Sequence, residues 1–547
     1  MMRSSGFAFG RRAATCALLA ALLAGCTRVQ TSAGGGNSFT HPHELRLVDN
    51  EDVSTLNPLL NSQELLSWLS ELTLAHLLRY DRHNTLAPEL ATEVPTQANG
   101  GISRDGKTVT YHLRHGVVWS DGAGFDADDV VFSTHVVLDP KTNVVTRDDW
   151  DKIAKIAEPD KYTIVYHLFR PDSTFVDTIF TPTGPALLPK HLLQHTKNIN
   201  TDPYNGLPLG IGPFKYVTWQ RGDHIEMVAN DRYWRGRPKL NRVVYKIIPS
   251  RDTIITALQT GQVDLWPEAP RAYRDRFTGL AGYHFVVQPS YVFGHLDFNV
   301  AHPDVADPLV RRAILLATPR KEIFQKLSRG LGVLQDSIVS PASPFHDPHT
   351  SFTPYDPARA NAMLDAAGWR RGADGVREKG GLRLSLDLVS NTGSADTDRL
   401  IEVLRQSWQA IGVTFVRRNI DPALLFAPYA TGGTIQTGKF DIVVFAWFLN
   451  ASGDLASIYD CAQIPPKGQN DLRWCDPAAS RAMLDFKSTS DNARRIRDDA
   501  IVQEQLVKET PTIVTSINAD IFVENTDLKN FRPNQVSFFD DMMDVDI

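Results

Sequence analysis

The side chains that could carry chemistry are histidine pairs, scattered carboxylates and four cysteines in a chain of 547 residues. His41/His43 and His346/His349 have spacings that a metal site could use, but we interpret them as surface loop residues. The sequence contains no G-x-S-x-G, S-x-x-K or H-E-x-x-H motif and no P-loop. The run 210–214 (GIGPF) lacks the third glycine of a dinucleotide site. We therefore expect no catalytic residues, no cofactor and no metal.

Cys26 follows an amino-terminal segment that has the layout of an export signal. The first twelve residues carry three arginines and no acidic residue, and an apolar run follows at 13–24. A basic start, a short apolar run and small residues before a cleavage point are typical of a secretory signal. Leu23-Ala24-Gly25 directly before Cys26 resembles the bacterial lipobox, in which the signal is cut before the cysteine and the thiol is acylated. We predict a signal peptide at 1–25.

The segment 26–42 is predicted to be a lipidated cysteine with a flexible tether, because it contains the small polar run 32–38 (SAGGGNS). Cys16 leaves with the signal, so two cysteines remain in the body of the protein, Cys461 and Cys475. Export implies an oxidising compartment, where an even pair favours a disulfide. Zinc is the alternative, but two thiols without C-x-x-C spacing or nearby histidines make a poor zinc site.

Composition excludes several classes of protein. The chain is 42% hydrophobic and 22% charged, which is ordinary for a globular protein, and its formal net charge is −6. Loss of 1–25 would remove three arginines and change this charge to −9. No basic stripe indicates a nucleic-acid partner, and no apolar run reaches the ~18 residues of a membrane span. The length predicts several domains or one large two-lobed unit.

Strand and helix patterns alternate along the chain, which indicates an α/β or mixed fold. Period-2 alternation predicts strands at 107–113 and 163–168. Carboxylates at 126–129 mark the start of a helix, where the helix dipole favours them. Asp356 and Pro357 predict the start of a second helix, and Asn492 is a possible N-cap for a third at 493–508.

Seven motifs in order, spread over most of the mature chain, indicate the family. They lie at 55–58, 110–133, 210–215, 230–240, 257–265, 355–369 and 438–447. Together they resemble those of the extracellular family 5 solute-binding proteins, the oligopeptide- and dipeptide-binding proteins of bacterial ABC importers. Within them we expect structural roles: Trp119 as a packing anchor beside a turn, and Asp129 and Asp264 as capping or pairing residues with no ligand contact.

The resemblance implies a fold of the periplasmic-binding-protein type II kind, with two α/β lobes, a hinge and the extra domain of the cluster C type. We expect lobe I at 43–75, 206–290 and 520–547, the extra domain at 76–205, and lobe II at 291–519. The amino-terminal segment and Cys26 predict an exported, lipid-anchored protein at the periplasmic or outer face of a membrane. Its partners would be a small solute and the ABC permease subunits; we expect a monomer that touches the membrane only through its lipid and binds no nucleic acid.

The resemblance also implies a site between the lobes, where an extended peptide pairs with two protein segments. These segments correspond here to Ser62-Gln63-Glu64 and to Trp447-Phe448-Leu449. The family's peptide binders have an aspartate for the peptide α-amino group where this chain has Asn450. Losing such a buried charge partner costs roughly 3–5 kcal/mol.

Two interpretations of this departure remain open. Asp454 replaces the missing aspartate, or the ligand lacks a free amine and is a blocked peptide, a sugar, a metal chelate or haem. Asp454 is alternatively a helix N-cap. The resemblance further implies that Cys461 and Cys475 are bridged beside the pocket. Alternatives of another class are an exported hydrolase and a receptor, chaperone or adhesion role on the same scaffold.

Overall fold

The computed structural model describes residues 36–547 apart from 62, 145–146, 148–149, 183, 393–394, 428, 430–431 and 450. The signal peptide, Cys26 and most of the tether therefore lie outside the described residues. The largest element is a ten-stranded mixed sheet with the order β16-β15-β17-β11-β18-β10-β1-β9-β8-β7. Its strands are β1 (Glu44–Asp49), β7 (Phe214–Gln220), β8 (His224–Ala229), β9 (Arg242–Ile247), β10 (Leu265–Trp266), β11 (Tyr283–Phe298), β15 (Ser385–Asn391), β16 (Thr414–Ile420), β17 (Ile442–Phe448) and β18 (Thr512–Asn525).

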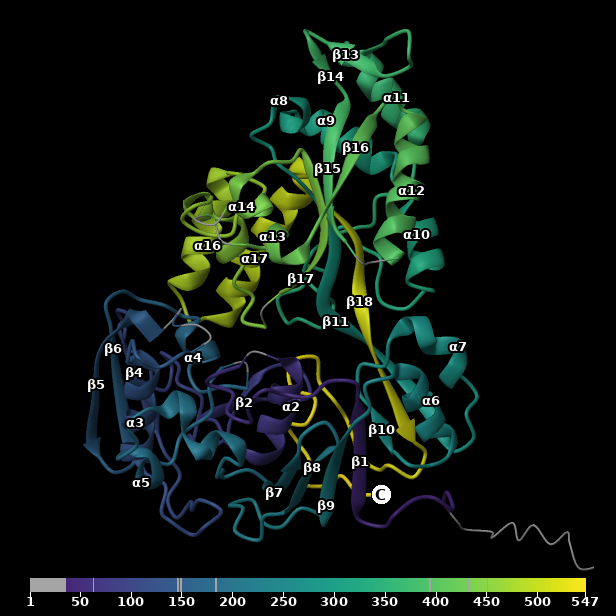
Figure 1. Ribbon diagram of the computed structural model, residues 1–547. Helices are drawn as coiled ribbons and strands as arrows, with labels where there is room; N and C mark the ends of the chain where they lie inside the picture. Colours follow the sequence, from purple (N-terminus) through teal and green to yellow (C-terminus); the bar gives the residue numbers. More distant parts are fainter. Residues whose placement is uncertain are drawn as a thin grey trace, which may run out of the picture.

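Two long strands, β11 and β18, run through both bodies of the molecule (Figure 1). They pair antiparallel along their length, but the register shifts between Pro289 and Phe293. Below the shift β18 pairs with β10, and above it β11 pairs with β17. The irregular stretch therefore lies where the chain passes from one body to the other, which is the place expected for a hinge.

The lower body is organised around β1, which lies between the parallel strands β9 and β10. Its four central residues are buried, as expected of a strand covered on both faces. The helices here are α2 (Glu64–Thr73), α6 (Arg251–Gln259) and α7 (Arg274–Phe277). The carboxyl ends of β1 and β10 meet at one edge, so the residues that follow them gather there.

The upper body is built on β15, β16 and β17, which are mutually parallel. Helices and short strands surround this half of the sheet (Figure 1). They are α8 (Pro303–Ala306), α9 (Pro308–Leu316), α10 (Arg320–Leu327), α11 (Pro357–Ala366), β12 (Arg370–Arg371), β13 (Arg377–Lys379), β14 (Leu382–Arg383), α12 (Ala395–Gln409), α13 (Pro422–Leu425), α14 (Thr434–Thr437), α15 (Ala456–Tyr459), α16 (Pro477–Lys487) and α17 (Asn492–Glu509).

A third core, formed by residues between Leu59 and Ile211, packs beside the lower body. It contains β2 (Leu78–Tyr80), β3 (Leu86–Pro88), β4 (Thr108–His112), β5 (Ile153–Asp160), β6 (Thr163–Leu168), α3 (Ala127–Leu138), α4 (Phe175–Thr178) and α5 (Lys190–Leu193). The two strands predicted from period-2 alternation are confirmed as β4 and β6, which pair with each other. The α/β class with two lobes and an added domain is confirmed; the exact boundaries of the three parts stay a prediction.

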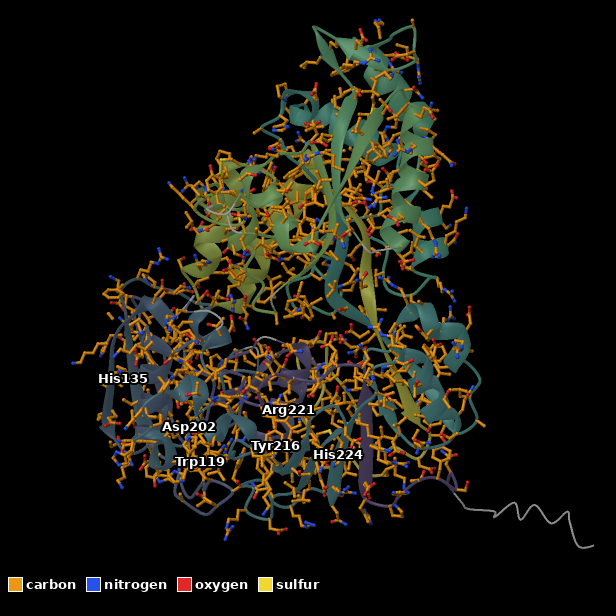
Figure 2. All side chains as sticks on the ribbon, in the orientation of Figure 1. Trp119, His135, Asp202, Tyr216, Arg221 and His224 are labelled. Carbon is orange, nitrogen blue, oxygen red and sulfur yellow. A yellow bond between two sulfur atoms is a disulfide. The ribbon has the colours of Figure 1, made fainter. Side chains whose placement is uncertain are left out.

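The motif residues of this third core have structural roles. Trp119 is buried and donates from Nε1 to the Asp129 carboxylate at 3.0 Å. Asp126 and Asp129 form the capping box that begins α3. Trp119 and His135 lie within this domain, whereas His224 lies on β8 of the lower body (Figure 2).

One predicted cap is wrong. Helix α17 begins at Asn492, and its N-cap is Asp491, whose carboxylate accepts from the N–H groups of Ala493 and Arg494. An aspartate at that position satisfies two otherwise unpaired N–H groups and favours the helix dipole, so it takes precedence over the neighbouring asparagine. The predicted cap at Asp356 is confirmed, since its carboxylate accepts from Arg359 N–H. Within the described residues, no helix is long and apolar enough to cross a membrane.

Candidate functional site

The two bodies face each other across a gap that is closed at one side by direct contacts. A cavity of about 160 Å³ lies at this side and is lined from below by Tyr80 and Val176 and from above by Phe345 and Ala451. Ser173 bonds to the carbonyls of Phe486 and Lys487 across the gap. The side chains that line the cavity therefore come from the added domain and from the upper body.

The second predicted ligand segment lies at the end of β17, next to this gap. Leu449 is buried, while Phe448 is 50% exposed and packs near Tyr291 at 6.4 Å between ring centroids. Trp447 is half-buried against Phe445, 5.5 Å away. One exposed aromatic beside a buried anchor is a surface that a ligand side chain could contact.

The backbone of β17 has an unpaired edge at this point. Its partner β15 pairs only as far as Ser390 with Val444, while β17 continues to Phe448. Leu449 N–H donates to the Tyr291 carbonyl of β11. Because backbone groups alternate in direction along an antiparallel pair, the odd-numbered residues of β17 direct their N–H and C=O groups toward β11. Ala446 and Phe448 therefore direct their N–H and C=O groups to the other edge, where no strand of the described residues pairs with them.

Such an edge can bind an extended chain by main-chain hydrogen bonds. This mode of recognition takes its affinity from the backbone and tolerates different side chains. It needs no catalytic group, because binding consists only of hydrogen bonds and contact.

The first predicted segment lies opposite, at the start of α2. Gln63 occupies the N-cap position but makes no cap bond; its side chain donates to the Asp52 carbonyl at 3.1 Å. Glu64 is exposed and shares a hydrogen bond with the carboxyl of Glu268, which follows β10. Two carboxyls in a hydrogen bond share a proton, so the pair carries one negative charge rather than two.

Burial, followed by the nearby charges of Glu64 and Asp520, raises the pKa of Glu268. Burial also raises the pKa of Asp520 to about 7. This side of the gap therefore gathers carboxyl groups whose pKa values are raised by burial and by one another. Ser62, the third residue of the first predicted segment, lies outside the described residues, as does Asn450.

Asp454 has partners that occupy its carboxylate. One oxygen accepts from Ala456 N–H at 2.9 Å at the start of α15, and the other pairs with Lys487 Nζ at 2.7 Å. The capping interpretation of Asp454 therefore agrees with these contacts, although the N-cap residue proper is Leu455. A carboxylate already neutralised by a lysine is a weak candidate for the peptide amine.

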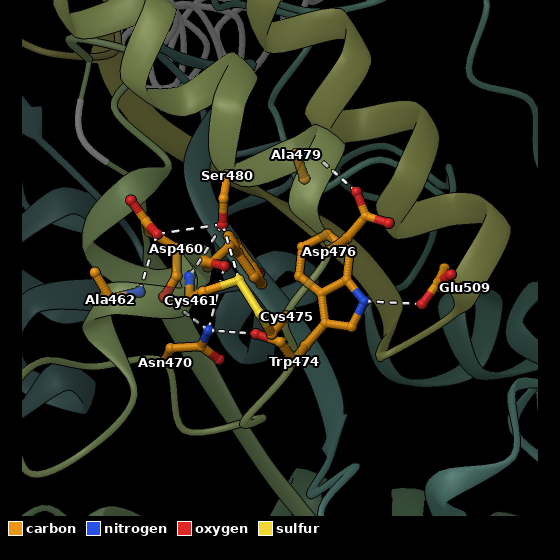
Figure 3. Close-up of a disulfide and its surroundings, with 11 residues drawn as sticks. Asp460, Cys461, Ala462, Asn470, Trp474, Cys475, Asp476, Ala479, Ser480 and Glu509 are labelled. Atoms are coloured by element: carbon orange, nitrogen blue, oxygen red, sulfur yellow. Dashed lines mark hydrogen bonds between the residues drawn. A yellow bond between two sulfur atoms is a disulfide. The ribbon is translucent and has the colours of Figure 1, made fainter.

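The predicted disulfide between Cys461 and Cys475 is present and joins residues 14 positions apart (Figure 3). Asn470 lies inside the loop and donates to the carbonyls of Tyr459, Asp460 and Trp474. Tyr459 and Trp474 belong to the same apolar core as Leu449. The disulfide therefore supports the buried anchor of the second ligand segment.

The histidines considered for metal binding have other contacts. His41 and His43 lie beside Glu44 and Asp546, and His346 beside the Val339 carbonyl. No cluster of three or more metal-ligating side chains is found in the part of the chain that the structure describes. Asp264, another motif residue, pairs with the buried Arg46.

Sequence reasoning missed three residues at the gap: Glu268, Tyr291 and Arg271. Glu268 lies three residues after the recognised motif at 257–265, and its backbone has a φ of 50°, which is uncommon outside glycine. No local pattern marks Tyr291 or Arg271, because their positions depend on the hinge crossing and on contacts distant in sequence.

Comparison with known proteins gives consistent results. The sequence profile of the bacterial extracellular solute-binding proteins, family 5 Middle, matches residues 85–464. The oligopeptide-binding protein AppA of Bacillus subtilis is 25% identical over 469 residues, covering 84% of this chain and 83% of AppA.

Two solved structures show the same fold. AppA from Bacillus subtilis in complex with a nonapeptide has a TM-score of 0.70 at 22% identity, covering 92% of this chain and 98% of that one. NikZ from Campylobacter jejuni in complex with Ni(L-His) also has a TM-score of 0.70, at 23% identity, covering 91% of this chain and 98% of that one. The fold alone therefore does not select a ligand.

Proposed function

Because the chain belongs to the bacterial extracellular solute-binding proteins of family 5, we propose that it captures a peptide and delivers it to an ABC importer. The peptide lies between two lobes that close around the register shift in β11 and β18. For the boundaries we propose 43–75, 206–290 and 520–547 as lobe I, 291–519 as lobe II, and 76–205 as the extra domain. The protein releases its ligand unchanged to the permease and is not an enzyme.

The observation that carries this proposal is the unpaired edge of β17. Ala446 and Phe448 offer donors and acceptors spaced for an extended chain, next to an exposed aromatic ring. Peptides present the complementary row of groups at every second residue, whereas sugars and metal chelates do not. The relative AppA, whose name states oligopeptide binding, agrees with this choice of ligand.

We further propose that residues 1–25 are a signal peptide and that Cys26 carries a lipid. The protein then works as a monomer at the periplasmic or outer face of the membrane, held by its lipid and the tether that ends near residue 42. Gln63 and Glu64 would contact the ligand from lobe I, and Trp447, Phe448 and Leu449 from lobe II. Ser62, Asn450 and Asp454 remain proposed ligand residues. Asp454 is the weakest candidate of the three, because its carboxylate already pairs with Lys487.

The test compares Phe448→Pro with the matched control Phe448→Ala in calorimetry with di-, tri- and nonapeptides. Both changes remove the aromatic ring, but only proline removes the N–H that faces the open edge. One lost hydrogen bond is worth about 0.5–1.5 kcal/mol, so the proline variant should bind roughly 2-fold to 12-fold more weakly than the alanine variant.

Mass spectrometry of the recovered peptide should show it intact. Equal affinities of the two Phe448 variants would refute the pairing at this edge. Binding of a sugar, haem or a metal chelate in place of every peptide would refute the peptide ligand, and cleavage of the peptide would refute a pure binding role. N-acetylated peptides decide whether a free amine matters: if they bind and free peptides do not, Asp454 is not the amine partner.

A further inference from the structure

A second, larger cavity lies at the end of the unpaired edge of β17. It has a volume of about 410 Å³, within the range of about 300–1,000 Å³ that is usual for small-ligand sites. Its walls include Asn391, the last residue of β15, and Ala446 of β17. A peptide paired with Ala446 and Phe448 therefore continues the line of β15, and one end of it reaches this cavity.

The lining of the cavity is mixed: it includes polar side chains such as Asp396 and a group of apolar ones. Of the apolar residues, Ile323 and Leu327 come from α10, Leu400 from α12, and Val444 from β17. Phe426 adds an aromatic ring that is 49% exposed and packs against Phe445 at 5.7 Å. Nearly half of this large apolar ring remains in water, so a ligand side chain could cover it.

Arg271 is the cationic side chain in this lining. It belongs to the lower body, yet it reaches the upper body, where its guanidinium donates to Ser328 Oγ at 3.4 Å. Among the described residues no ion pair includes Arg271, although the exposed Asp396 of α12 lies close enough to interact with its charge. Asp396 itself pairs with Arg399 at 3.1 Å.

Burial lowers the pKa of Arg271, and the charge of Asp396 only partly opposes this. A guanidinium that is half-buried with one long hydrogen bond has donors to spare. A carboxylate is the ligand group that matches it, because guanidinium and carboxylate form short, charge-assisted and often paired hydrogen bonds.

We propose that Arg271 binds the terminal carboxylate of the peptide, whose last side chain lies against the apolar lining beside Phe426. This inference rests on the proposed peptide function and adds to it an orientation and a preference: the carboxyl end of the ligand points into the 410 Å³ cavity. Peptides that end in a free, apolar residue are the expected ligand class.

The chain offers a matched control for the test. Arg274 is three residues away in α7 and donates to the Arg329 carbonyl across the same hinge, but it does not line the cavity. Arg271→Gln and Arg274→Gln therefore remove the same charge from the same segment, and only the first should alter carboxylate recognition.

The experiment measures, by calorimetry, one peptide ending in leucine as the free acid and as the C-terminal amide. The wild-type protein should prefer the acid by roughly 10-fold to 100-fold, the range for a hydrogen bond to a charged group. Arg271→Gln should lose this preference while binding the amide as the wild type does, and Arg274→Gln should keep it. The acid and amide comparison on the wild-type protein needs no variant, so it is informative even if Arg271→Gln does not fold.

The outcomes separate this inference from the function on which it rests. Peptide binding that does not distinguish acid from amide refutes the role of Arg271 and leaves the peptide function standing. A preference that persists in Arg271→Gln places the carboxylate elsewhere and also refutes the role. Absence of binding to any peptide refutes both proposals.

Discussion

The contact between Asp177 and Arg495 should control how firmly the two bodies close. Asp177 lies on α4 of the added domain and Arg495 on α17 of the upper body, two helices that face each other across the gap (Figure 1). Their side chains are 10% and 7% exposed, and the guanidinium lies 2.8 Å from the carboxylate. The same nitrogen donates to the Ser452 carbonyl at 2.8 Å, so the pair also reaches the loop that follows β17.

Two aromatic rings enclose the guanidinium, with centroids 4.4 Å away for Phe486 and 5.0 Å for Phe345. The change Arg495→Met keeps an apolar stem between these rings but removes the guanidinium that pairs with the buried Asp177 carboxylate. Breaking a buried ion pair from one side costs about 3–5 kcal/mol. This cost falls on the closed form, because the carboxylate regains water when the bodies separate.

A penalty of about 3 kcal/mol on the closed form corresponds to roughly a hundredfold shift in its population. If peptide binds tightly only between closed lobes, the apparent Kd rises by the factor by which the closed fraction falls. We therefore expect Arg495→Met to weaken peptide binding by roughly 10-fold to 100-fold. The thermal midpoint of the ligand-free protein should change much less.

The assay is calorimetric titration of wild type, Arg495→Met, Asp177→Asn and the double variant. The double variant leaves no unpaired charge, so it should bind better than the sum of the single losses predicts. Peptide affinity of Arg495→Met within twofold of wild type would refute the reasoning. So would an equal loss of stability with and without ligand, since that would place the effect on folding rather than on closure.

Three further predictions concern the disulfide, the pH dependence of stability and the lipid. Replacing both Cys461 and Cys475 by serine should lower the free energy of unfolding by at most about 3 kcal/mol, because the hydrogen bonds of Asn470 still hold the loop. It should also weaken peptide binding, because the loop supports the core in which Leu449 is anchored. Unchanged peptide affinity in calorimetry would contradict this. Burial raises the pKa of Glu71 to about 8, whereas in the unfolded chain it is about 4.3. The protonated carboxyl therefore contributes fully to the free energy of unfolding below pH ~4.3, and this contribution is lost as the pH rises toward 8. Chemical denaturation from pH 5 to 8 should therefore show a steeper loss of stability in the wild type than in Glu71→Gln, and parallel curves would show that Glu71 does not titrate in this range. Cys26→Ser should abolish incorporation of labelled fatty acid in the producing bacterium and release the protein from membranes, whereas continued labelling would assign the lipid to another residue.

The local features that the sequence predicts are those whose causes are local. The strands at β4 and β6 follow from alternation along a few residues, and the cap at Asp356 from one carboxylate before a proline. The disulfide follows from the number of cysteines and the expected compartment. The family is inferred from motifs whose residues pack inside one domain, as Trp119 does against Asp129. Such motifs indicate the fold, but these two residues do not line the gap.

The polar contacts at the gap could not be predicted in this way. Asp177 and Arg495 are 318 residues apart, and Asp454, in the loop before α15, pairs with Lys487 at the end of α16. Each carboxylate is one of 63 acidic residues that a single sequence cannot pair with its 57 basic ones. The interpretation of Asp454 as an amine partner depended on its distance in sequence from Trp447, whereas its contacts depend on where α16 ends.

The unpaired edge of β17 follows from a difference in strand length that only the register reveals. No pattern in the sequence states that β15 stops pairing with β17 at Ser390 while β17 continues by four residues. If β17 were shifted by one residue against β11, Trp447 would direct its backbone to the open edge in place of Ala446 and Phe448. The Phe448 ring would then leave the gap, since successive side chains alternate between the two faces of a strand. The same alternation that makes a strand easy to recognise therefore leaves its binding edge undetermined until the neighbouring strands are in place.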